Sequence, residues 1–493
     1  MSTDWIDKWS IYSPTKLALE ELDSHKSINY FDLNKRANAL AYYLLNVLQL
    51  KKGDRVGLLS EFNINTFILF SAIQKTGLIL VPLNYRLTNK ELDFIIDDSN
   101  LSILIYDNKF NQQAFHLDVN HFEFESIYAK TTEYSGIAYT ADVNTEDPVF
   151  ILYTSGTTGF PKGAIYTHKM MLWNSINTML RLQLNGNDST LLCTPTFHTG
   201  GWNVLATPLL FVGGTIYIMP KFEADIALDC LMEKEINLFM TVPTMTKMLV
   251  EQEKFNTASF PKLRFYIVGG EALPISLIET WAEKNVPIRQ GYGLTEAGPN
   301  ITSLPEADAL RKRGSIGFLN FYVEHKLMNE QLEECVGEES GELWLKGDVV
   351  TPGYWNNPSA TEKAFQDGWF RTGDVLRKDE EGYLYIVDRI KNMFISGGEN
   401  VYPAEIEREL RDHPLINEIG VIGVKDEKWG EVGTAYYTSV SGEKLDKDEL
   451  VKFCLARLAK YKIPKYFVHI HEMPKTDTGK LDKVALKKIG EQV

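Results

Sequence analysis

The sequence predicts an α/β protein with a large N-terminal domain of two sheet-and-helix subdomains plus a small antiparallel subdomain, followed by a small α+β C-terminal domain. Three observations lead to this fold class. Short apolar runs alternate with helical patterns through the first half of the chain, Gly-rich segments with short strand patterns follow, and the C-terminal part has an apolar pattern of its own. A chain of 493 residues has room for about three domains or subdomains.

The first alternation indicates a parallel sheet covered by helices. Strands are predicted at Arg55–Ser60, Leu78–Val81 and Leu101–Tyr106, and helices at Ile64–Lys75 and from Thr88 onward. The helix that begins at Thr88 has a capping box, because Glu91 stands three residues later. Buried strands separated by helices are typical of parallel sheets with both faces covered.

The same rhythm returns after Gly214 and predicts the second sheet-and-helix subdomain. The strands are Thr215–Met219, Leu238–Val242 and Phe265–Val268, and the helices are Ala224–Glu235 and Met245–Gln252. No fixed repeat of about 20–50 residues is apparent, which argues against a solenoid or a propeller.

From Gly317 onward the sequence becomes rich in glycine and in short strand patterns, which predicts the antiparallel subdomain. The charged segment Asp388–Lys391 is the expected boundary, so that residues 1–388 form the N-terminal domain and residues 389–493 the C-terminal domain. About 100 residues are enough for a small separate domain. Its predicted elements are helix Ala404–Arg411, strands Ile419–Val424 and Thr434–Val440, and helix Lys447–Leu458.

Composition and charge exclude several classes of protein. Hydrophobic residues make up 44% and charged residues 24% of the chain, which is ordinary for a globular protein and excludes wholesale disorder. The net charge of −15 argues against a nucleic-acid binder and against a general binder of anionic membranes. A local basic pocket for phosphates is compatible with this charge.

The cysteines and the apolar stretches favour a cytoplasmic protein without an integral membrane segment. The cysteines lie far apart and form no CxxC pair, which indicates neither a zinc site nor a disulfide framework: Cys193, Cys230, Cys335 and Cys454. The first ten residues carry two Asp and no apolar core, so no secretory signal is expected there. Phe67–Val81 and Trp202–Met219 are apolar, but polar residues, prolines or glycines interrupt both.

The most informative segment is YTSGTTGFPKG, Tyr153–Gly163, which follows the apolar strand Pro148–Leu152. Its glycines leave backbone N–H groups unblocked, its hydroxyls add hydrogen-bond donors and Lys162 adds a positive charge. This combination suits the oxygen anions of a polyphosphate. The segment is not a Walker A motif, because a Phe-Pro pair separates the last glycine of the loop from the lysine.

Further motifs follow in order: TPTFHTGG (Thr194–Gly201), GGEALP (Gly269–Pro274), GYGLTE (Gly291–Glu296), TGD (Thr372–Asp374), DRIKNMFISGGENVYPAEIE (Asp388–Glu407) and PKTDTGK (Pro474–Lys480). With these motifs, the sequence resembles the adenylate-forming (ANL) superfamily of acyl-CoA synthetases, peptide-synthetase adenylation domains and luciferases. The resemblance covers nearly the whole chain. It implies the ANL adenylating-enzyme fold, with an adenylating N-terminal domain and a mobile C-terminal domain that carries the catalytic lysine.

The resemblance implies an ATP site. The phosphates would lie against Thr154, Ser155, Gly156, Thr157, Thr158, Gly159 and Lys162, and the adenine against Gly270, Glu271, Ala272 and Tyr292. Gly293 is a further expected cofactor-binding residue. Thr295 would reach the α-phosphate, and Glu296 would bind Mg²⁺, because a hard dication prefers carboxylate, phosphate and water oxygens. Asp374 would accept hydrogen bonds from the ribose, with Arg389 beside it.

The residues that the resemblance assigns to catalysis are Lys480, Thr295, Glu296 and His198. Lys480 would bridge two anions that repel each other, the carboxylate and the α-phosphate. No general base is needed, because a carboxylic acid is already ionised at neutral pH. The C-terminal domain would rotate about Lys391 and present either Lys480 or the loop with Gly397 and Gly398, past which a pantetheine arm reaches the adenylate. His198 would gate this thiol route.

The acyl pocket that the resemblance implies is lined by His198, Gly200, Trp202, Val242, Gly269, Gly293 and Ile301. These residues are mostly apolar, which favours an alkyl or aryl carboxylate. Trp202 is expected to limit the depth of the pocket or to stack on an aryl ring. Amino-acid adenylation domains place an Asp just after the aromatic residue of this region, where this chain has His-Thr-Gly, so the ammonium of an amino acid would be unpaired.

The sequence therefore predicts an ATP-dependent acid–thiol ligase that forms an acyl-adenylate, releases pyrophosphate and transfers the acyl group to coenzyme A. A medium- or long-chain fatty acid is the expected substrate, and the segment HTGGWNVLATPLL looks closest to fatty-acyl and succinylbenzoate-type CoA ligases. The alternatives are a ligase for benzoate-, succinylbenzoate- or cinnamate-like aryl acids and an adenylation module that loads a separate carrier protein. The expected cofactors are ATP, Mg²⁺ and coenzyme A, and a homodimer is compatible with the sequence.

Overall fold

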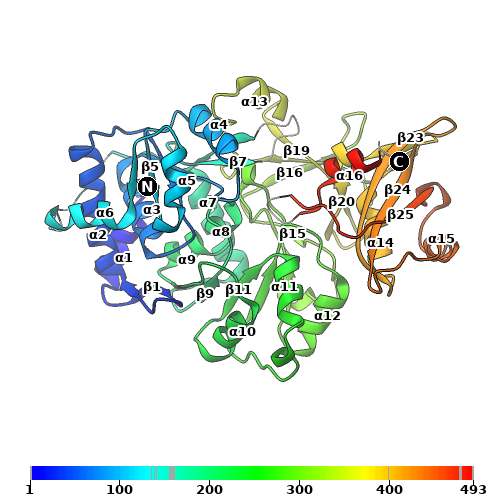
Figure 1. The fold of residues 1–493 in the computed structure, drawn as a ribbon, viewed down its shortest axis with the longest axis horizontal. Coiled ribbons are helices and arrows are strands. Elements are labelled where there is room, and N and C mark those ends of the chain that lie inside the picture. Colours follow the sequence, from blue (N-terminus) through cyan, green and yellow to red (C-terminus); the bar gives the residue numbers. More distant parts are fainter. Residues whose placement is uncertain are drawn as a thin grey trace.

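Two large sheets, each accompanied by helices, form most of the N-terminal part of the fold (Figure 1). The computed structural model describes residues 3–134, 136, 137, 139, 142–154, 161–397, 399–476 and 480–490. The first sheet has the strand order β6-β5-β3-β4-β7-β8, and its neighbours are parallel except β7 and β8. Its strands are β3 (Arg55–Leu59), β4 (Ile79–Pro82), β5 (Ile103–Tyr106), β6 (His121–Glu123), β7 (Pro148–Thr154) and β8 (Lys162–Thr167). The helices of this stretch are α3 (Ile64–Thr76), α4 (Asn89–Ser99), α5 (Asn111–His116) and α6 (Phe124–Thr131).

The second sheet has the order β13-β12-β11-β9-β10-β1-β2. Its strands are β9 (Ser189–Leu192), β10 (Thr215–Ile218), β11 (Leu238–Thr241), β12 (Phe265–Val268), β13 (Ile288–Gln290), β1 (Leu17–Glu21) and β2 (Ser27–Asn29). The N-terminal strand β1 lies parallel to β10, with Leu19 opposite Ile216, so the start of the chain completes this sheet. The helices are α1 (Trp5–Tyr12), α2 (Tyr30–Tyr42), α7 (His168–Leu182), α8 (Thr199–Asn203), α9 (Ala206–Val212), α10 (Ala224–Glu233), α11 (Pro243–Val250) and α12 (Ile275–Glu283).

Local capping sets both ends of α4, and the sequence predicts the first of them. The backbone N–H of Thr88 donates to Glu91 Oε2 at 2.8 Å, and the Thr88 hydroxyl donates to the same oxygen at 2.7 Å. The helix ends at Asn100, whose φ of 47° is left-handed. Asparagine tolerates this conformation better than most residues, so it closes the helix without a glycine.

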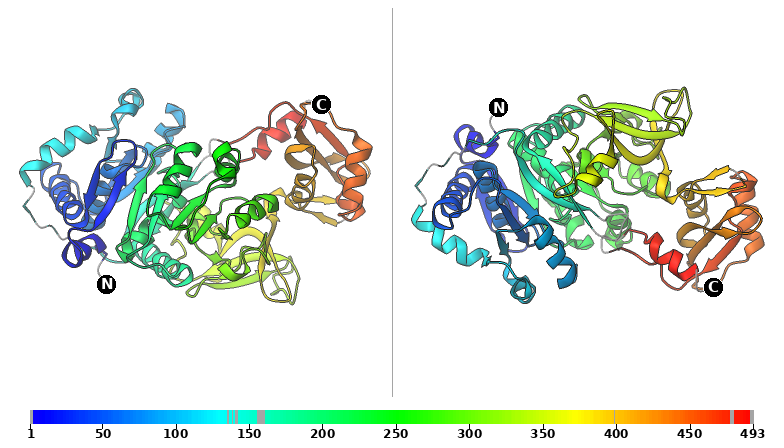
Figure 2. Two further views of the ribbon diagram at one scale, coloured as in Figure 1. Left: turned by 90° about the horizontal axis from the view of Figure 1, so that it is seen from below. Right: turned by 90° about the horizontal axis from the view of Figure 1, so that it is seen from above.

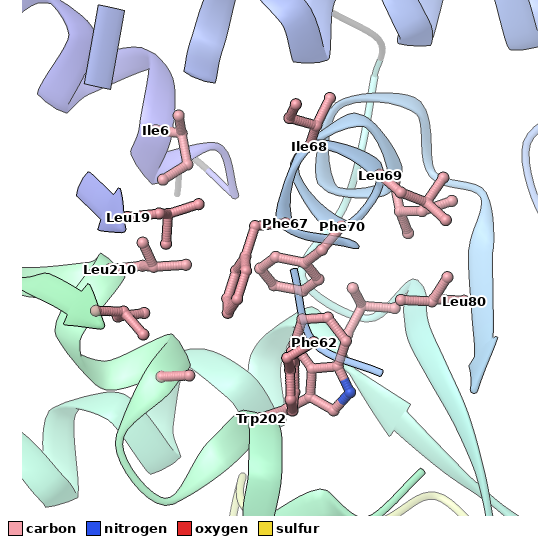
Figure 3. Close-up of a cluster of buried hydrophobic side chains, with 14 of the residues drawn as sticks. Ile6, Leu19, Phe62, Phe67, Ile68, Leu69, Phe70, Leu80, Trp202 and Leu210 are labelled. Atoms are coloured by element: carbon pink, nitrogen blue, oxygen red, sulfur yellow. The ribbon is translucent and has the colours of Figure 1, made fainter. Parts of the chain in front are cut away.

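The largest apolar core lies around α3, between the two sheets (Figure 3). Phe67, Ile68, Leu69 and Phe70 are all fully buried, so α3 is apolar on every side. A helix that is apolar all round lies inside a protein core or a membrane. Among the described residues, no helix has the length and apolarity that a membrane span requires.

A third sheet is antiparallel throughout, as predicted. It consists of β16 (Glu324–Met328), β17 (Gly341–Lys346), β18 (Phe365–Gln366), β19 (Trp369–Lys378) and β20 (Leu384–Arg389), with α13 (Pro358–Ala364) beside it. The short pair β14 (Thr302–Ser303) and β15 (Phe318–Leu319) precedes it. β20 ends at Arg389, and the next strand begins at Phe394.

The C-terminal domain lies to one side of the rest of the molecule (Figure 2). Its sheet contains β21 (Phe394–Ser396), β22 (Glu399–Val401), β23 (Ile416–Asp426), β24 (Gly430–Ser439) and β25 (Tyr466–His469). Its helices are α14 (Pro403–Arg411), α15 (Lys447–Leu455) and α16 (Lys483–Gly490). It has its own buried core, in which Phe394 and Ile406 take part. The predicted fold class is confirmed: a large mixed α/β N-terminal domain and a small α+β C-terminal domain.

Candidate active site

The residues predicted to bind ATP and the acyl group follow the carboxyl ends of parallel strands. These residues are Thr154 at the end of β7 and His198, Val242, Gly269 and Tyr292 after β9, β11, β12 and β13. The carboxyl ends of the two sheets are joined, because Thr196 Oγ1, after β9, donates to the backbone oxygen of Ser60, after β3, at 2.6 Å. In open α/β sheets, ligands bind outside this end of the strands.

Tyr292, Asp374 and Arg389 form a hydrogen-bonded group at the predicted ribose position. The antiparallel pairing of β19 with β20 sets Asp374 opposite Arg389, whose Nε donates to Asp374 Oδ1 at 2.9 Å. The Tyr292 hydroxyl donates to the other carboxylate oxygen at 2.6 Å. The Asp374 carboxylate raises the pKa of Arg389, and burial raises the pKa of Tyr292, so both donors keep their protons. A carboxylate has further lone pairs with which to accept ribose hydroxyls.

Glu296 lies with Thr295 in a short 3-10 turn, η5 (Thr295–Ala297). Its Oε1 accepts a hydrogen bond from the Tyr354 hydroxyl at 2.8 Å, and its backbone oxygen accepts one from Thr351 N–H at 2.7 Å. Burial raises the pKa of Glu296, and the Tyr354 hydroxyl opposes this shift. A desolvated carboxylate of this kind fits Mg²⁺, which prefers hard oxygen donors and whose charge would stabilise the ionised form.

Thr154 and Lys162 stand at the two ends of the predicted phosphate loop. They face each other across β7 and β8, with Thr154 Oγ1 3.4 Å from the backbone oxygen of Lys162. Lys162 Nζ lies 5.3 Å from the centroid of the Tyr354 ring, whose hydroxyl bonds Glu296. The cation at the end of the loop and the predicted Mg²⁺ ligand therefore share one neighbour. The other predicted loop residues lie outside the described residues: Ser155, Gly156, Thr157, Thr158 and Gly159.

Lys480 belongs to the C-terminal domain but lies close to the ATP residues of the N-terminal domain. Its backbone oxygen accepts from Thr476 N–H at 2.7 Å. The side chain is exposed, yet neighbouring protein atoms displace enough water to lower its pKa, while the carboxylate of Glu271 and, less strongly, that of Asp374 raise it. The charges of Glu271 and Asp374 therefore act on Lys480 across the boundary between the domains.

His198 opens α8 and packs in a group of aromatic rings. Its ring centroid lies 4.7 Å from that of Phe197, which in turn lies 5.1 Å from that of Tyr85. Burial, together with the charges of Lys480 and Arg86, lowers the pKa of His198 to about 4. The imidazole is therefore neutral at pH 7, and Lys480 approaches it from the other domain.

Three glycines, one after β9 and two after β12, have few protein atoms beside them, so open space adjoins each of them. A methyl group added at Gly200 would meet only Met240 Cε, at 3.7 Å, and one added at Gly270 would meet only Val242 Cγ1, also at 3.7 Å. At Gly269 it would meet only the backbone oxygen of Gly291, at 3.8 Å. The side chains that approach two of these glycines, Met240 and Val242, are apolar, which suits an apolar ligand.

Two family profiles together cover most of the chain. The profile of AMP-binding enzymes matches residues 7–355, and the profile of the C-terminal domain of AMP-binding enzymes matches residues 405–480. The chain belongs to the AMP-binding enzyme family. The predicted adenylate-forming family is thereby confirmed.

Relatives of this AMP-binding enzyme match it along nearly their whole length. It is 34% identical to a feruloyl-CoA synthase from Amycolatopsis sp., over 93% of each chain. It is also 34% identical to a long-chain-fatty-acid–CoA ligase from Mycobacterium tuberculosis, over 96% of this chain and 95% of the relative. The solved o-succinylbenzoate–CoA synthetase from Bacillus subtilis, in complex with ATP and a magnesium ion, matches the fold with a TM-score of 0.87 and 30% identity, over 98% of this chain and 99% of that one.

The structure of this AMP-binding enzyme corrects the expected position of Trp202. The indole is fully buried, its Nε1 donates to the backbone oxygen of Thr196 at 2.6 Å, and its ring packs against Phe62 and Phe70 with centroids 4.7 and 5.2 Å away (Figure 3). Two residues along a helix turn the side chain by about 200°. Gly200 therefore borders the open space, while Trp202 points into the core and does not line the acyl pocket.

Two other predicted pocket residues are packed against protein atoms. Ile301 is 1% exposed and packs in the core of the antiparallel subdomain. A methyl group on Gly293 would lie 2.2 Å from the backbone of Pro299, so this glycine is needed for close packing of the chain on itself. The predicted adenine-binding segment after β12 is exposed and comprises Gly270, Glu271 and Ala272.

The predicted hinge and thiol loop lie where the C-terminal domain begins. Lys391 is in the 3-10 turn η7 (Ile390–Asn392), and burial lowers its pKa. Gly397 follows β21 with a left-handed φ of 63°, and its N–H donates to the backbone oxygen of Trp429 at 2.8 Å. A methyl group on Gly397 would meet the indole of Trp429 at 2.9 Å. Gly398 lies outside the described residues.

Three residues that the sequence did not single out border these sites. Tyr354 bonds Glu296, Met240 faces Gly200, and Trp429 covers Gly397. One feature of the sequence could have indicated Met240, since an unbranched apolar side chain in a central strand can border a cavity as well as fill a core. No such feature indicated Tyr354 or Trp429, because their roles come from segments that are distant in sequence.

Proposed function

We propose that this AMP-binding enzyme is an acid–thiol ligase whose acid substrate is a medium- or long-chain fatty acid. The reaction class is that of its relatives, which join acyl or aryl acids to coenzyme A. ATP, Mg²⁺ and coenzyme A are accordingly the co-substrates and the metal. The observation that carries the two-step assignment is that Lys480, which belongs to the small domain, interacts electrostatically with Glu271 and Asp374 of the large one.

In the first step, a carboxylate oxygen forms a bond to the α-phosphorus of ATP, and the bond to the leaving pyrophosphate breaks. Two anions meet, so positive charge is needed where they meet. Lys480 supplies that charge from the C-terminal domain, and Lys162 supplies a second one at the end of the phosphate loop. Glu296 would hold Mg²⁺, which supplies further positive charge to phosphate oxygens. The acid is already ionised at neutral pH, so no residue has to remove a proton.

In the second step, the sulfur of coenzyme A loses its proton to solvent and forms a bond to the acyl carbon, and the bond between the acyl carbon and the phosphate oxygen of AMP breaks. We infer that the C-terminal domain turns about Lys391 and brings the Gly397–Gly398 loop to the place that Lys480 occupied. Support comes from the short turn that holds Lys391, between sheets that end at Arg389 and begin at Phe394. Neutral His198, beside both the acyl space and Lys480, would gate the approach of the thiol.

The acid is inferred to be apolar because Met240 and Val242 border the glycine-lined space. A charged group on the acid would be desolvated there at a cost. An aryl acid is the second candidate. Gly200, Gly269 and Gly270 leave backbone faces open on several sides, and a flat ring fits such a space as well as a flexible chain does.

The proposed setting is the cytoplasm. All four cysteines are free and buried, which suits a reducing compartment. The predicted homodimer stays a prediction.

The test is a screen of carboxylic acids for pyrophosphate release, with and without coenzyme A. Fatty acids of medium or long chain should give the highest kcat/KM, and coenzyme A should convert the product to a thioester. Higher kcat/KM for aryl acids would favour the second candidate. Pyrophosphate release without thioester formation on coenzyme A would indicate that a carrier protein accepts the acyl group.

A further inference from the structure

The break between α8 and α9 leaves two buried carbonyls at the end of a short helix. α8 ends at Asn203 and α9 begins at Ala206, so the oxygens of Asn203 and Val204 lie beyond the last turn of α8. Asn203 is fully buried and Val204 is 5% exposed. Buried carbonyls at a helix end need hydrogen-bond donors from elsewhere in the chain.

Two asparagine amides supply these donors. Asn174 Nδ2, on α7, donates to Asn203 O at 2.7 Å. Asn300 Nδ2 donates to Val204 O at 3.0 Å and to Thr178 Oγ1 at 2.6 Å, and it lies 3.2 Å from Asn203 O. One amide comes from the neighbouring helix, and the other comes from the ATP side of the site.

Asn300 is part of the segment that carries the ATP residues. The segment contains Tyr292 and Glu296 and closes on itself, because Ile301 N–H donates to Tyr292 O at 2.9 Å. The backbone oxygen of Asn300 accepts in turn from Asn320 Nδ2 at 2.8 Å. The side chain of Asn300 therefore extends from a well-bonded turn on the ATP side to the end of α8.

We propose that Asn300 is a positioning residue that holds α8 in register with the ATP-side turn. The inference rests on the proposed function, in which the carboxylate of the acid must be aligned with the α-phosphate. His198 and Gly200 stand at the other end of α8, so one short helix joins the acyl side to the amide of Asn300. Misplacing reacting groups by about 1 Å can cost on the order of a hundredfold in rate.

The test compares Asn300→Leu with Asn320→Leu. The first variant keeps the approximate size of the side chain and removes the amide that holds α8. The second removes a bond to the same turn, and Asn320 has no hydrogen bond to α8 among the described residues. Acid-dependent exchange of pyrophosphate into ATP gives KM for the acid and kcat, direct titration gives the affinity for ATP, and thermal unfolding reports stability.

Asn300→Leu should raise KM for the acid about tenfold or more, because the amide loses its buried hydrogen bonds to Val204 O and Thr178 Oγ1, and it should lower kcat. Its affinity for ATP should stay within about twofold, because no ATP-binding side chain is removed. Asn320→Leu should lower the thermal stability and leave the ratio of KM for the acid to the dissociation constant for ATP unchanged. Two results would overturn the positioning role. One is an equal change in KM for the acid and in the dissociation constant for ATP in Asn300→Leu. The other is a rise in KM for the acid without a change in ATP affinity in Asn320→Leu.

Thr178→Val keeps the proposal testable if Asn300→Leu does not fold. It preserves the shape of a buried side chain and removes the acceptor of the shortest bond to Asn300. KM for the acid should rise about threefold while the affinity for ATP stays constant. A result without this difference counts against the proposal. A wild-type protein that binds ATP but shows no exchange with any acid would overturn the proposed function, and this inference with it.

Discussion

The ATP side and the acyl side of the site are built in different ways. On the ATP side, Tyr292, Asp374 and Arg389 are bonded to one another at 2.6 and 2.9 Å, and Glu296 is bonded to Tyr354 at 2.8 Å. On the acyl side, glycine backbones leave open space, and the side chains nearest to Gly200 and Gly270 are the apolar ones of Met240 and Val242. A site held by polar bonds is preorganised for one ligand, whereas a site defined by space admits a range of acids. Substitutions on the ATP side should therefore change KM for ATP or the rate of pyrophosphate release. Substitutions on the acyl side should change which acid the enzyme prefers.

Trp202→Ala tests where the acyl side ends and the core begins, and it should have the largest effect on stability. Removing a fully buried indole should lower the free energy of unfolding by about 3–5 kcal/mol. Urea unfolding measures this loss, with Phe115→Ala as the control because Phe115 is 65% exposed. The acid profile of the folded fraction should stay unchanged. A shift towards bulkier acids would return Trp202 to the wall of the pocket.

Glu296→Gln should lower acid-dependent pyrophosphate release by about a hundredfold at limiting Mg²⁺. The neutral amide keeps the shape of the side chain and loses the charge that holds the metal. Exposed Glu338 provides the matched variant Glu338→Gln, which should behave as wild type. Wild-type rates for Glu296→Gln at limiting Mg²⁺ would remove the metal-binding role.

Tyr292→Phe removes one hydrogen bond from the ribose position. The Asp374 carboxylate is 3% exposed and would lose its 2.6 Å donor, so KM for ATP should rise about tenfold. The acid profile should not change. Tyr322→Phe, in which the ring is 50% exposed, controls for the loss of a hydroxyl elsewhere. An unchanged KM for ATP would mean that this group is not part of the nucleotide site.

Met240→Ala makes the complementary change on the acyl side. It enlarges the space beside Gly200, so the ratio of kcat/KM for bulky over small acids should rise about fivefold. KM for ATP should stay constant. Met248→Ala, on α11 and 44% exposed, should leave the ratio unchanged. A uniform fall in kcat/KM for all acids would show that Met240 supports the fold and does not select the acid.

The smallest predicted effect concerns pH and lies outside both sides of the site. His168 is 2% exposed, and burial lowers its pKa to about 4. The unfolded chain therefore binds a proton that the folded chain does not between pH 4 and the ordinary histidine pKa near 6.5, and stability falls as the pH drops through this window. At pH 6 the loss should be roughly 0.8 kcal/mol. His168→Phe should remove this part of the pH dependence of unfolding, and an unaltered dependence would assign it to other groups.

The sequence was sufficient for features that depend on neighbours along the chain. The capping box of Thr88 and Glu91, the strand Phe265–Val268 and the alternation of strands and helices all follow from local patterns. The pairing of β1 with β10 could not be predicted from local patterns, because nothing in either strand specifies a partner so far away in the chain.

In the candidate site, too, residues within sequence motifs were predicted, and contacts between distant segments were not. The order of motifs predicted Glu296, Asp374 and Arg389, and the structure brings the last two into contact. Trp202 was misplaced because spacing from His198 along the chain ignores the rotation within α8. Tyr354 was missed because its bond to Glu296 depends on the pairing of the segment around it with β8.

The central claim is that one small domain serves two steps, and separate assays of the two half-reactions test it most directly. The variants are Lys480→Ala, with Lys475→Ala as its control, and Gly397→Leu, with Gly442→Leu as its control. Lys475 pairs with Glu418 at 2.7 Å. Gly442 has the same left-handed backbone as Gly397, with φ of 75°, but no atom within 4 Å of an added methyl group.

Pyrophosphate release reports the first step, and thioester formation from supplied acyl-adenylate and coenzyme A reports the second. Lys480→Ala should lower the first by about a hundredfold or more and preserve the second, because only the first joins two anions. Gly397→Leu should lower the second and preserve the first, and both control variants should retain both steps. If Lys480→Ala and Gly397→Leu lose both steps to the same extent, a single static site explains the enzyme better than a rotating domain.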